Sequence, residues 1–491
     1  MKFKYIWMFL VLAGLTSCES DDEGNVVIPE VELTAGEADF SKFISLGNSL
    51  TAGYTDNALF IAGQQSSMPN LMAQQFALVG GGAFNQPLTS DNIGGLTLGG
   101  NVIAPPRLFF DGAGPALLPA VPTTEVSNIL SGPFNNLGVP GAKSFHLLAN
   151  GYGNIGNVQL GLANPYFVRM ASNPDASVIE DALAQSPTFF SLWIGNNDVL
   201  GYATTGGDGT NPITDQATFA GTYSAIVAAL GSTGAKGLIA NIPDVTSIPF
   251  FTTVPYNSVP LDAATANQLN AGFALYNGGI VQAFAFLVAN NLISQADADA
   301  EIAKRTVVYS EGQNPMLIMD ETLTDLTAIN PGLVSMRPAT ADDLFVLTSS
   351  SFIGTTVGGN PTLINGVSVP LADNWVLLPS EQMEIKSATE AFNAVIQSAA
   401  QSGGYAYVDA NGILNQMASS GYSDGDFTFT ASLVLGGFFS LDGVHPNSRG
   451  FSMMANEALK AIDATYGSTF EASNNLLDVG DYPTNYPSSL Q

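Results

Sequence analysis

The chain has 491 residues and a formal net charge of −29 at pH 7, with only 13 Lys and Arg residues. So acidic a surface repels phosphate backbones and anionic lipid, which argues against nucleic-acid binding. One cysteine and two histidines argue against a zinc site and leave no disulfide, so stability must come from a hydrophobic core.

The first 17 residues have the organisation of a secretory signal peptide. Lys2 and Lys4 precede an apolar stretch at 5–15, which is too short for an ordinary membrane span. The stretch ends in Leu-Thr-Ser-Cys, which resembles a bacterial lipobox. This resemblance implies cleavage before Cys18 and lipidation of its sulfur and amino groups. The alternative is a secreted protein with an incidental cysteine.

Residues 18–38 are expected to form a lipidated, acidic tether. The sequence Glu-Ser-Asp-Asp-Glu-Gly-Asn at 19–25 resembles the acidic export signal that follows the cysteine in surface lipoproteins of the Bacteroidetes. The resemblance implies an outer-membrane lipoprotein exposed at the cell surface. The alternative is an anchor that faces the periplasm, with the acidic run serving only as a solvated spacer.

One domain is expected from residue 39 to residue 467, and its first strand is predicted at 43–46. The sequence Gly-Asn-Ser-Leu follows at 47–50. A strand that breaks at glycine and turns into a helix places the next side chain at the carboxyl edge of a sheet, where open α/β sheets bind ligands. Ser49 is therefore positioned as a nucleophile, although a serine after a strand is more often a helix cap.

Buried strands and amphipathic helices alternate along the rest of this domain. Continuous apolar runs at 188–194, 237–243 and 405–409 predict further parallel strands. Apolar residues spaced to one face predict helices around 385–399 and 451–462.

Four segments depart from this alternation. Residues 81–133 are rich in Gly and Pro and predict long loops over the active-site edge, whereas residues 307–379 alternate weakly and predict a small β-rich insertion. Residues 262–305 are helical and rather apolar, but their amide side chains favour a packed helix or pair over a membrane span. The tail at 468–491 is irregular.

The two histidines differ in their neighbours. His445 follows an aspartate by three residues in Asp-Gly-Val-His-Pro, and such a step lets Asp442 accept from one ring nitrogen while the other stays free to take a proton. Histidine is the most frequent general base near neutral pH. Taken alone, the step could also be a solvated Asp and a loop His. His146 has no such partner and is interpreted as structural, or as a residue of the cleft wall.

Four short motifs, read in chain order, resemble the four sequence blocks of the SGNH, or GDSL-type, hydrolases. They are Gly-Asn-Ser-Leu at 47–50, Asn-Leu-Gly-Val-Pro-Gly-Ala at 136–142, Gly-Asn-Asn-Asp at 195–198 and Asp-Gly-Val-His-Pro at 442–446. Asn48 stands where the family usually has Asp, outside the catalytic set. The resemblance implies a three-layer α/β/α sandwich with a mostly parallel, flavodoxin-like sheet.

The resemblance also implies a role for five residues. Ser49 would be the nucleophile, His445 the general base and Asp442 its partner. The N–H groups of Ser49 and Gly141 and the side-chain amide of Asn197 would bind the oxyanion. A turn-forming role is the alternative for Asn197. The implied activity is hydrolysis of carboxylic esters through a serine acyl-enzyme, on acyl lipids, short-chain esters or acetylated glycans.

A different class of function remains open, in which the chain is a non-catalytic binding lipoprotein of the cell surface that keeps the same fold. The intact set of catalytic residue types argues against it, because a decayed site usually loses one. We expect no cofactor and no metal. Acidic pairs at 297–299 and 424–426 could hold calcium, but a solvated helix face and a solvated loop are the simpler interpretations. The sequence leaves the acyl group and the oligomeric state open.

Overall fold

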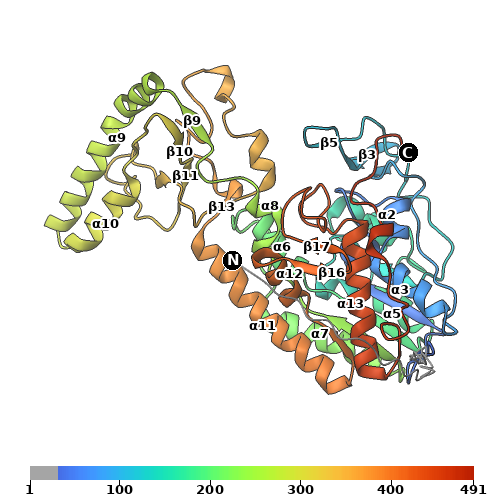
Figure 1. Ribbon diagram of the computed structural model, residues 1–491. Coiled ribbons are helices and arrows are strands. Elements are labelled where there is room, and N and C mark those ends of the chain that lie inside the picture. Colours follow the sequence, from blue (N-terminus) through green and yellow to red (C-terminus); the bar gives the residue numbers. More distant parts are fainter. Residues whose placement is uncertain (1–30) are drawn as a thin grey trace, which may run out of the picture.

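The computed structural model describes residues 31–491 (Figure 1). The predicted signal peptide, Cys18 and most of the acidic tether lie outside the described residues. The described chain is an α/β/α sandwich around a parallel sheet, and a second, separately packed part projects from one side of it. We call the sandwich the body and the projecting part the arm.

The central sheet has five parallel strands in the order β15-β8-β7-β1-β6. They are β1 (Phe43–Gly47), β6 (Asn136–Gly138), β7 (Phe189–Trp193), β8 (Lys236–Ala240) and β15 (Ala406–Val408). Numbered along the chain, this order is 2-1-3-4-5, which is that of flavodoxin-like sheets. The predicted fold class is therefore confirmed. The strand order reverses beside β1, and ligands of such sheets bind at this point.

Helices cover both faces of the sheet. α3 (Met68–Ala77) and α13 (Ser448–Tyr466) pack together on one face, and α7 (Gln216–Gly231) and α11 (Pro379–Gly403) on the other. Every residue of β1 and β7 is buried, as a strand covered on both faces requires. The body also contains α1 (Ser49–Ala52), α2 (Ile61–Gln65), α4 (Pro165–Val168), α5 (Val178–Leu183), α6 (Asn197–Thr204), α8 (Pro249–Thr252), α12 (Ala410–Ser419), β16 (Tyr422–Asp424) and β17 (Phe427–Phe429).

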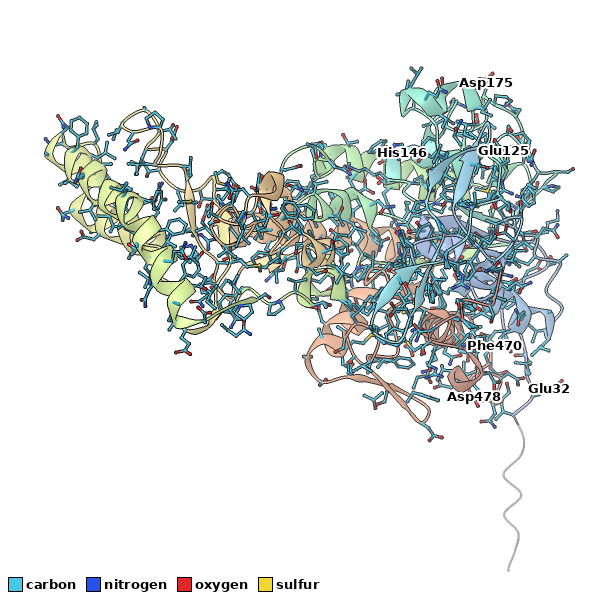
Figure 2. The ribbon with its side chains drawn as sticks, turned by 90° about the horizontal axis from the view of Figure 1, so that it is seen from above. Glu32, Glu125, His146, Asp175, Phe470 and Asp478 are labelled. Atoms are coloured by element: carbon cyan, nitrogen blue, oxygen red, sulfur yellow. The ribbon has the colours of Figure 1, made fainter. Side chains whose placement is uncertain are left out.

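The arm lies between α8 and α11 and has a core of its own, with buried side chains from Val254 to Leu378. Figures 1 and 2 show its two helices projecting away from the body. It contains α9 (Ala263–Ala289), α10 (Gln295–Arg305) and the antiparallel pairs β9 (Val259–Leu261) with β10 (Gly312–Asn314), β11 (Leu317–Met319) with β12 (Met336–Pro338), and β13 (Leu344–Phe345) with β14 (Val376–Leu377). The arm thus exceeds the β-rich segment at 307–379, because the helical pair shares its core.

α9 is long and apolar enough to cross a membrane by length and composition alone. In the structure its buried face, which includes Phe273, Ile280 and Phe284, packs into the core of the arm, and α10 packs against it. The segment is therefore a packed helical pair, as its amide side chains indicate. Leu275, on the opposite face, is exposed.

The Gly- and Pro-rich segment at 81–133 contains two hairpins as well as loops. They are β2 (Leu96–Leu98) with β3 (Asn101–Ala104), and β4 (Leu108–Phe110) with β5 (Pro115–Leu117). Strands this short leave no period in the sequence, so only loops were expected. Arg107, buried between the hairpins, donates to the backbone carbonyls of Tyr486, Pro487 and Leu490. The irregular tail is held beside these hairpins (Figure 1).

Candidate active site

Ser49 lies at the start of α1, at the carboxyl edge of β1. The turn depends on Gly47, because a side chain there would overlap the carbonyl oxygen of Trp193 on β7. Asn48 caps the helix, and its Oδ1 accepts the N–H of Leu50 at 3.0 Å. Strand, turn and cap together hold the Ser49 hydroxyl at the point where the strand order reverses.

His445 reaches Ser49 from the other end of the chain. The distance from His445 Nε2 to Ser49 Oγ is 2.8 Å, and that from His445 Nδ1 to Asp442 Oδ2 is 2.9 Å. A carboxylate can only accept, so Nδ1 carries the proton and Nε2 accepts from the serine hydroxyl. The side chains of His445 and Asp442 are 14% and 7% exposed. This chain of hydrogen bonds is the arrangement that activates a serine.

The Asp442 carboxylate is fixed by three backbone N–H groups. Oδ1 accepts from Val444 at 2.8 Å and from His445 at 2.9 Å, and Oδ2 accepts from Asn57 at 2.9 Å. Burial alone would raise the pKa of Asp442, but His445 and the backbone donors lower the pKa to about 2. Asp442 is therefore ionised at neutral pH and able to stabilise an imidazolium.

The loop that follows Tyr54 contains a supporting residue, Asp56, that the sequence pattern does not reveal. Asp56 is buried, and its Oδ1 accepts the N–H of Leu441 at 3.1 Å, while its own N–H donates to Ser440 Oγ. Together with the Asn57 bond to Asp442, these contacts join the nucleophile loop to the Asp442 loop. Burial raises the pKa of Asp56 to about 7. An Asp-Asn pair in a turn carries no signal of such a role.

Two of the three predicted oxyanion donors are backbone N–H groups. Among the described residues, neither the N–H of Ser49 nor that of Gly141 donates a hydrogen bond to a protein acceptor. Gly141 is exposed and has a φ of +83°, a conformation that favours glycine. Both N–H groups are therefore free to bind an oxyanion.

The third predicted donor, Asn197, begins α6 and turns its amide toward the same loop. Its Nδ2 donates to the carbonyl of Ala142, the residue after Gly141, at 2.9 Å. This bond uses one of the two amide hydrogens and leaves the other free. It also fixes which end of the amide is the donor.

Asp198 holds the loop that carries Gly141 against α6. Its two carboxylate oxygens accept the N–H and the hydroxyl of Ser144, each at 2.8 Å. Burial raises the pKa of Asp198. The sequence alone gives no signal of this role for Asp198. Its contacts tie the loop after the second motif to the third motif.

Asn48 and Asn196 form a buried amide pair behind Ser49. Asn48 Nδ2 donates to Asn196 Oδ1 at 3.1 Å, and Asn196 Nδ2 finds no hydrogen-bond partner in the described part of the chain. An acceptor at position 48, such as an aspartate, would satisfy that free amide once Asn196 had rotated. Asn48 therefore caps the helix but leaves a neighbouring donor unused.

His146 is not part of this site. Its Nδ1 accepts the N–H of Lys143 at 3.0 Å, and its ring stacks on Tyr152 with 4.6 Å between centroids. Burial and the charge of Lys143 lower the pKa of His146 to about 4, so the ring is neutral at pH 7. Figure 2 shows it on the α/β body. Its contacts are those of a structural histidine.

A cavity opens beside the hydroxyl of Ser49. The space inside it that a water-sized sphere can occupy is about 60 Å³, and Ser49, Asn197 and His445 line it. Gly141 lies outside this lining. The rest of the wall is almost entirely apolar and includes Leu200, Val245, Ile413, Leu414, Met417 and Phe438. Such a wall suits an alkyl chain better than a sugar.

Comparison with known proteins gives little beyond this geometry. No family model and no curated protein matches the chain. A solved structure to which the chain is similar belongs to a protein of Parabacteroides merdae that is described, provisionally, as a GDSL-like lipase. The two share 10% identity over 88% of this chain and 99% of that one, with a TM-score of 0.32. The case for a function therefore depends on the site itself.

Proposed function

We propose that the chain is a serine esterase that hydrolyses carboxylic esters through an acyl-enzyme. One observation carries the proposal: the hydrogen-bonded series from Ser49 through His445 to Asp442. A binding protein of the same fold would have no need of a histidine base oriented by a buried, ionised carboxylate. The competing assignment, a non-catalytic lipoprotein, has no observation of its own in its favour.

The geometry suits each chemical step. Ser49 Oγ attacks the carbonyl carbon as His445 Nε2 takes its proton, and the same nitrogen returns the proton to the leaving alkoxide. Asp442 stabilises the imidazolium between these steps. The N–H groups of Ser49 and Gly141 and the Asn197 amide hydrogen bind the oxyanion. Water then releases the acid from Ser49 by the reverse sequence of proton transfers.

We propose an ester with an apolar acyl chain as the substrate class. The cavity beside Ser49 offers alkyl and aromatic contacts and few polar partners. Each buried CH₂ group is worth about 0.8 kcal/mol, so a medium-length chain gains more from this wall than an acetyl group does. Lipid acyl esters and longer alkyl esters therefore fit better than acetylated glycans.

A series of p-nitrophenyl esters tests both the activity and the substrate class. The full chain should hydrolyse octanoate with a higher kcat/KM than acetate. Ile413→Trp, which fills the cavity from α12, should lower kcat/KM for octanoate by about 10-fold or more, equivalent to about two CH₂ contacts, and should affect acetate less. Ala418→Trp, on the exposed side of the same helix, is the matched control. No turnover of any ester would contradict the esterase; equal losses on both esters would contradict the acyl cavity.

We propose further that the protein is an outer-membrane lipoprotein, exposed at the cell surface and anchored through Cys18. The proposal depends on the lipobox-like sequence and the acidic run that follows it. A lipoprotein of this kind carries more than one acyl chain, as stable anchoring requires. The alternative is an anchor that faces the periplasm. Proteolysis of intact cells distinguishes the two, because only a surface-exposed protein would be cleaved.

Metabolic labelling with a palmitate analogue tests the anchor. The wild type should be labelled and should sediment with membranes, whereas Cys18→Ala should be unlabelled, because Cys18 is the only cysteine of the chain. Ser17→Ala, next to the proposed cleavage site, is the control and should be labelled. An unlabelled wild type found only in the culture fluid would rule out lipidation.

A further inference from the structure

Three carboxylates meet where the arm joins the body. They belong to Glu321 and Asp373 of the arm and to Glu381 in the first turn of α11. One oxygen of each lies within 4.8 Å of an oxygen of the other two. Carboxylates at such distances repel one another strongly unless a proton or a cation lies between them.

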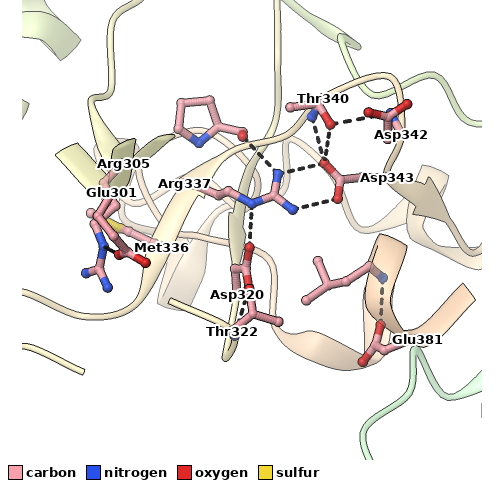
Figure 3. A network of polar contacts seen from close by, with 12 residues as sticks. Glu301, Arg305, Asp320, Thr322, Met336, Arg337, Thr340, Asp342, Asp343 and Glu381 are labelled. Carbon is pink, nitrogen blue, oxygen red and sulfur yellow. Dashed lines mark hydrogen bonds and ion pairs between the residues drawn. The ribbon is translucent and has the colours of Figure 1, made fainter. Parts of the chain in front are cut away.

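Among residues 31–491, no basic side chain is paired with these three carboxylates. In the described part of the chain, none of the ion pairs involves any of the three residues. Arg337, drawn in the same view as Glu381, is already paired with Asp320 and Asp343 on two sides (Figure 3). Within the described residues, the charge of the cluster is therefore not balanced by an ion pair.

One carboxylate is buried and a second is partly buried, and both are incompletely bonded. Glu381 is only 4% exposed; its Oε2 accepts the N–H of Leu378 at 2.6 Å, and its Oε1 accepts no hydrogen bond from a described residue. Oδ1 of Asp373 is buried and also has no partner within the described residues. Burial and the neighbouring carboxylates raise the pKa of Glu381 to about 8 and the pKa of Asp373 to about 6. A buried acceptor without a donor, as Asp373 Oδ1 is among the described residues, is costly unless something positive lies beside it.

We propose that Glu321, Asp373 and Glu381 bind a divalent cation, with Ca²⁺ as the best match. Carboxylate oxygens are the ligands that this hard cation prefers, and it tolerates an irregular set completed by water. Glu321 is exposed, so the site is open to solvent on one side and accessible to an ion. The cluster contains no His or Cys, which disfavours zinc.

The position of the site gives the cation a structural task. Gly206 and Gly207 follow α6 and pack closely on the cluster, the former against the carbonyl of Asp373 and the latter against Oε1 of Glu381. The first residue of α6 is Asn197. A bound cation would therefore tie the arm to α11, against which α6, the helix of the proposed oxyanion donor, packs.

Thermal unfolding of the full chain, first treated with EDTA, tests the proposal without reference to activity. Millimolar CaCl₂ should raise the Tm of the wild type by at least about 2 °C. The same rise should occur in Glu390→Gln, which removes an exposed charge from the same helix, α11. Glu321→Gln and Asp373→Asn should not respond. Calorimetric titration with CaCl₂ should give one site in the responding proteins and none in the other two.

The stability of the variants in EDTA separates a cation from a shared proton. Glu321→Gln and Asp373→Asn remove repulsion, so both should fold and should be at least as stable as the wild type without calcium. The proposal would be overturned if neither CaCl₂ nor MgCl₂ changed the Tm of the wild type, because a proton shared between the carboxylates would then suffice. A calcium response retained in both variants would equally overturn it.

Discussion

Ser49→Ala and His445→Ala should each lower kcat on a soluble ester by about 10⁴-fold or more, the loss typical of a serine triad that acts as a unit. Without Ser49 no acyl-enzyme forms, and without His445 the hydroxyl keeps its proton. Steady-state kinetics on p-nitrophenyl octanoate measure the loss. A fluorophosphonate probe, which reacts with activated serines, should label the wild type and fail to label either variant.

Two controls make this result specific. The unfolding midpoints of Ser49→Ala and His445→Ala should stay near that of the wild type, because both side chains already border a cavity. His146→Phe keeps an aromatic ring on Tyr152 and should retain turnover. Full activity in His445→Ala, combined with its loss in His146→Phe, would show that the wrong histidine has been assigned as the base.

The sheet and the order of the site residues were predictable because their signals are local. The strands at 43–46 and 188–194 are continuous apolar runs, and each leads into one of the motifs. Parallel strands place their carboxyl ends on one edge, so residues as far apart as Ser49 and Asn197 lie near each other once the topology is known. His445 was selected by its scarcity and by Asp442 three residues before it.

The supporting contacts were not predictable, because they depend on pairs of residues far apart in the chain. Asn57 donates to Asp442 through its backbone, so its side chain gives no signal. Asp198 can hold the loop that carries Gly141 only because the fold brings Ser144 against its carboxylate. The three carboxylates of the proposed cation site are separated by 52 and 8 positions and follow no ligand spacing, so the expectation of no metal rested on motifs alone.

Asn197→Ala should lower kcat by about 10²–10³, corresponding to about 2.7–4 kcal/mol of transition-state stabilisation, while KM changes little. The amide hydrogen that is left free by the bond to Ala142 should interact more strongly with the developing oxyanion than with the neutral carbonyl. The same bond also holds the loop that carries Gly141. Part of the loss in kcat will therefore come from displacement of that loop. A KM that rises with kcat unchanged would contradict an oxyanion role.

Asn197→Asp separates the donor role from the structural one. An ionised Asp at 197 has nearly the shape of Asn but donates nothing, and it repels both the oxyanion and the Ala142 carbonyl, so kcat should fall further than in Asn197→Ala. Asn48→Asp is the matched change behind Ser49. Its carboxylate can keep the cap on Leu50 and accept from the unused amide of Asn196, so kcat should stay within a few-fold of wild type. Near-wild-type kcat in Asn197→Asp would exclude the donor role, because no carboxylate at that position could stabilise a negative intermediate.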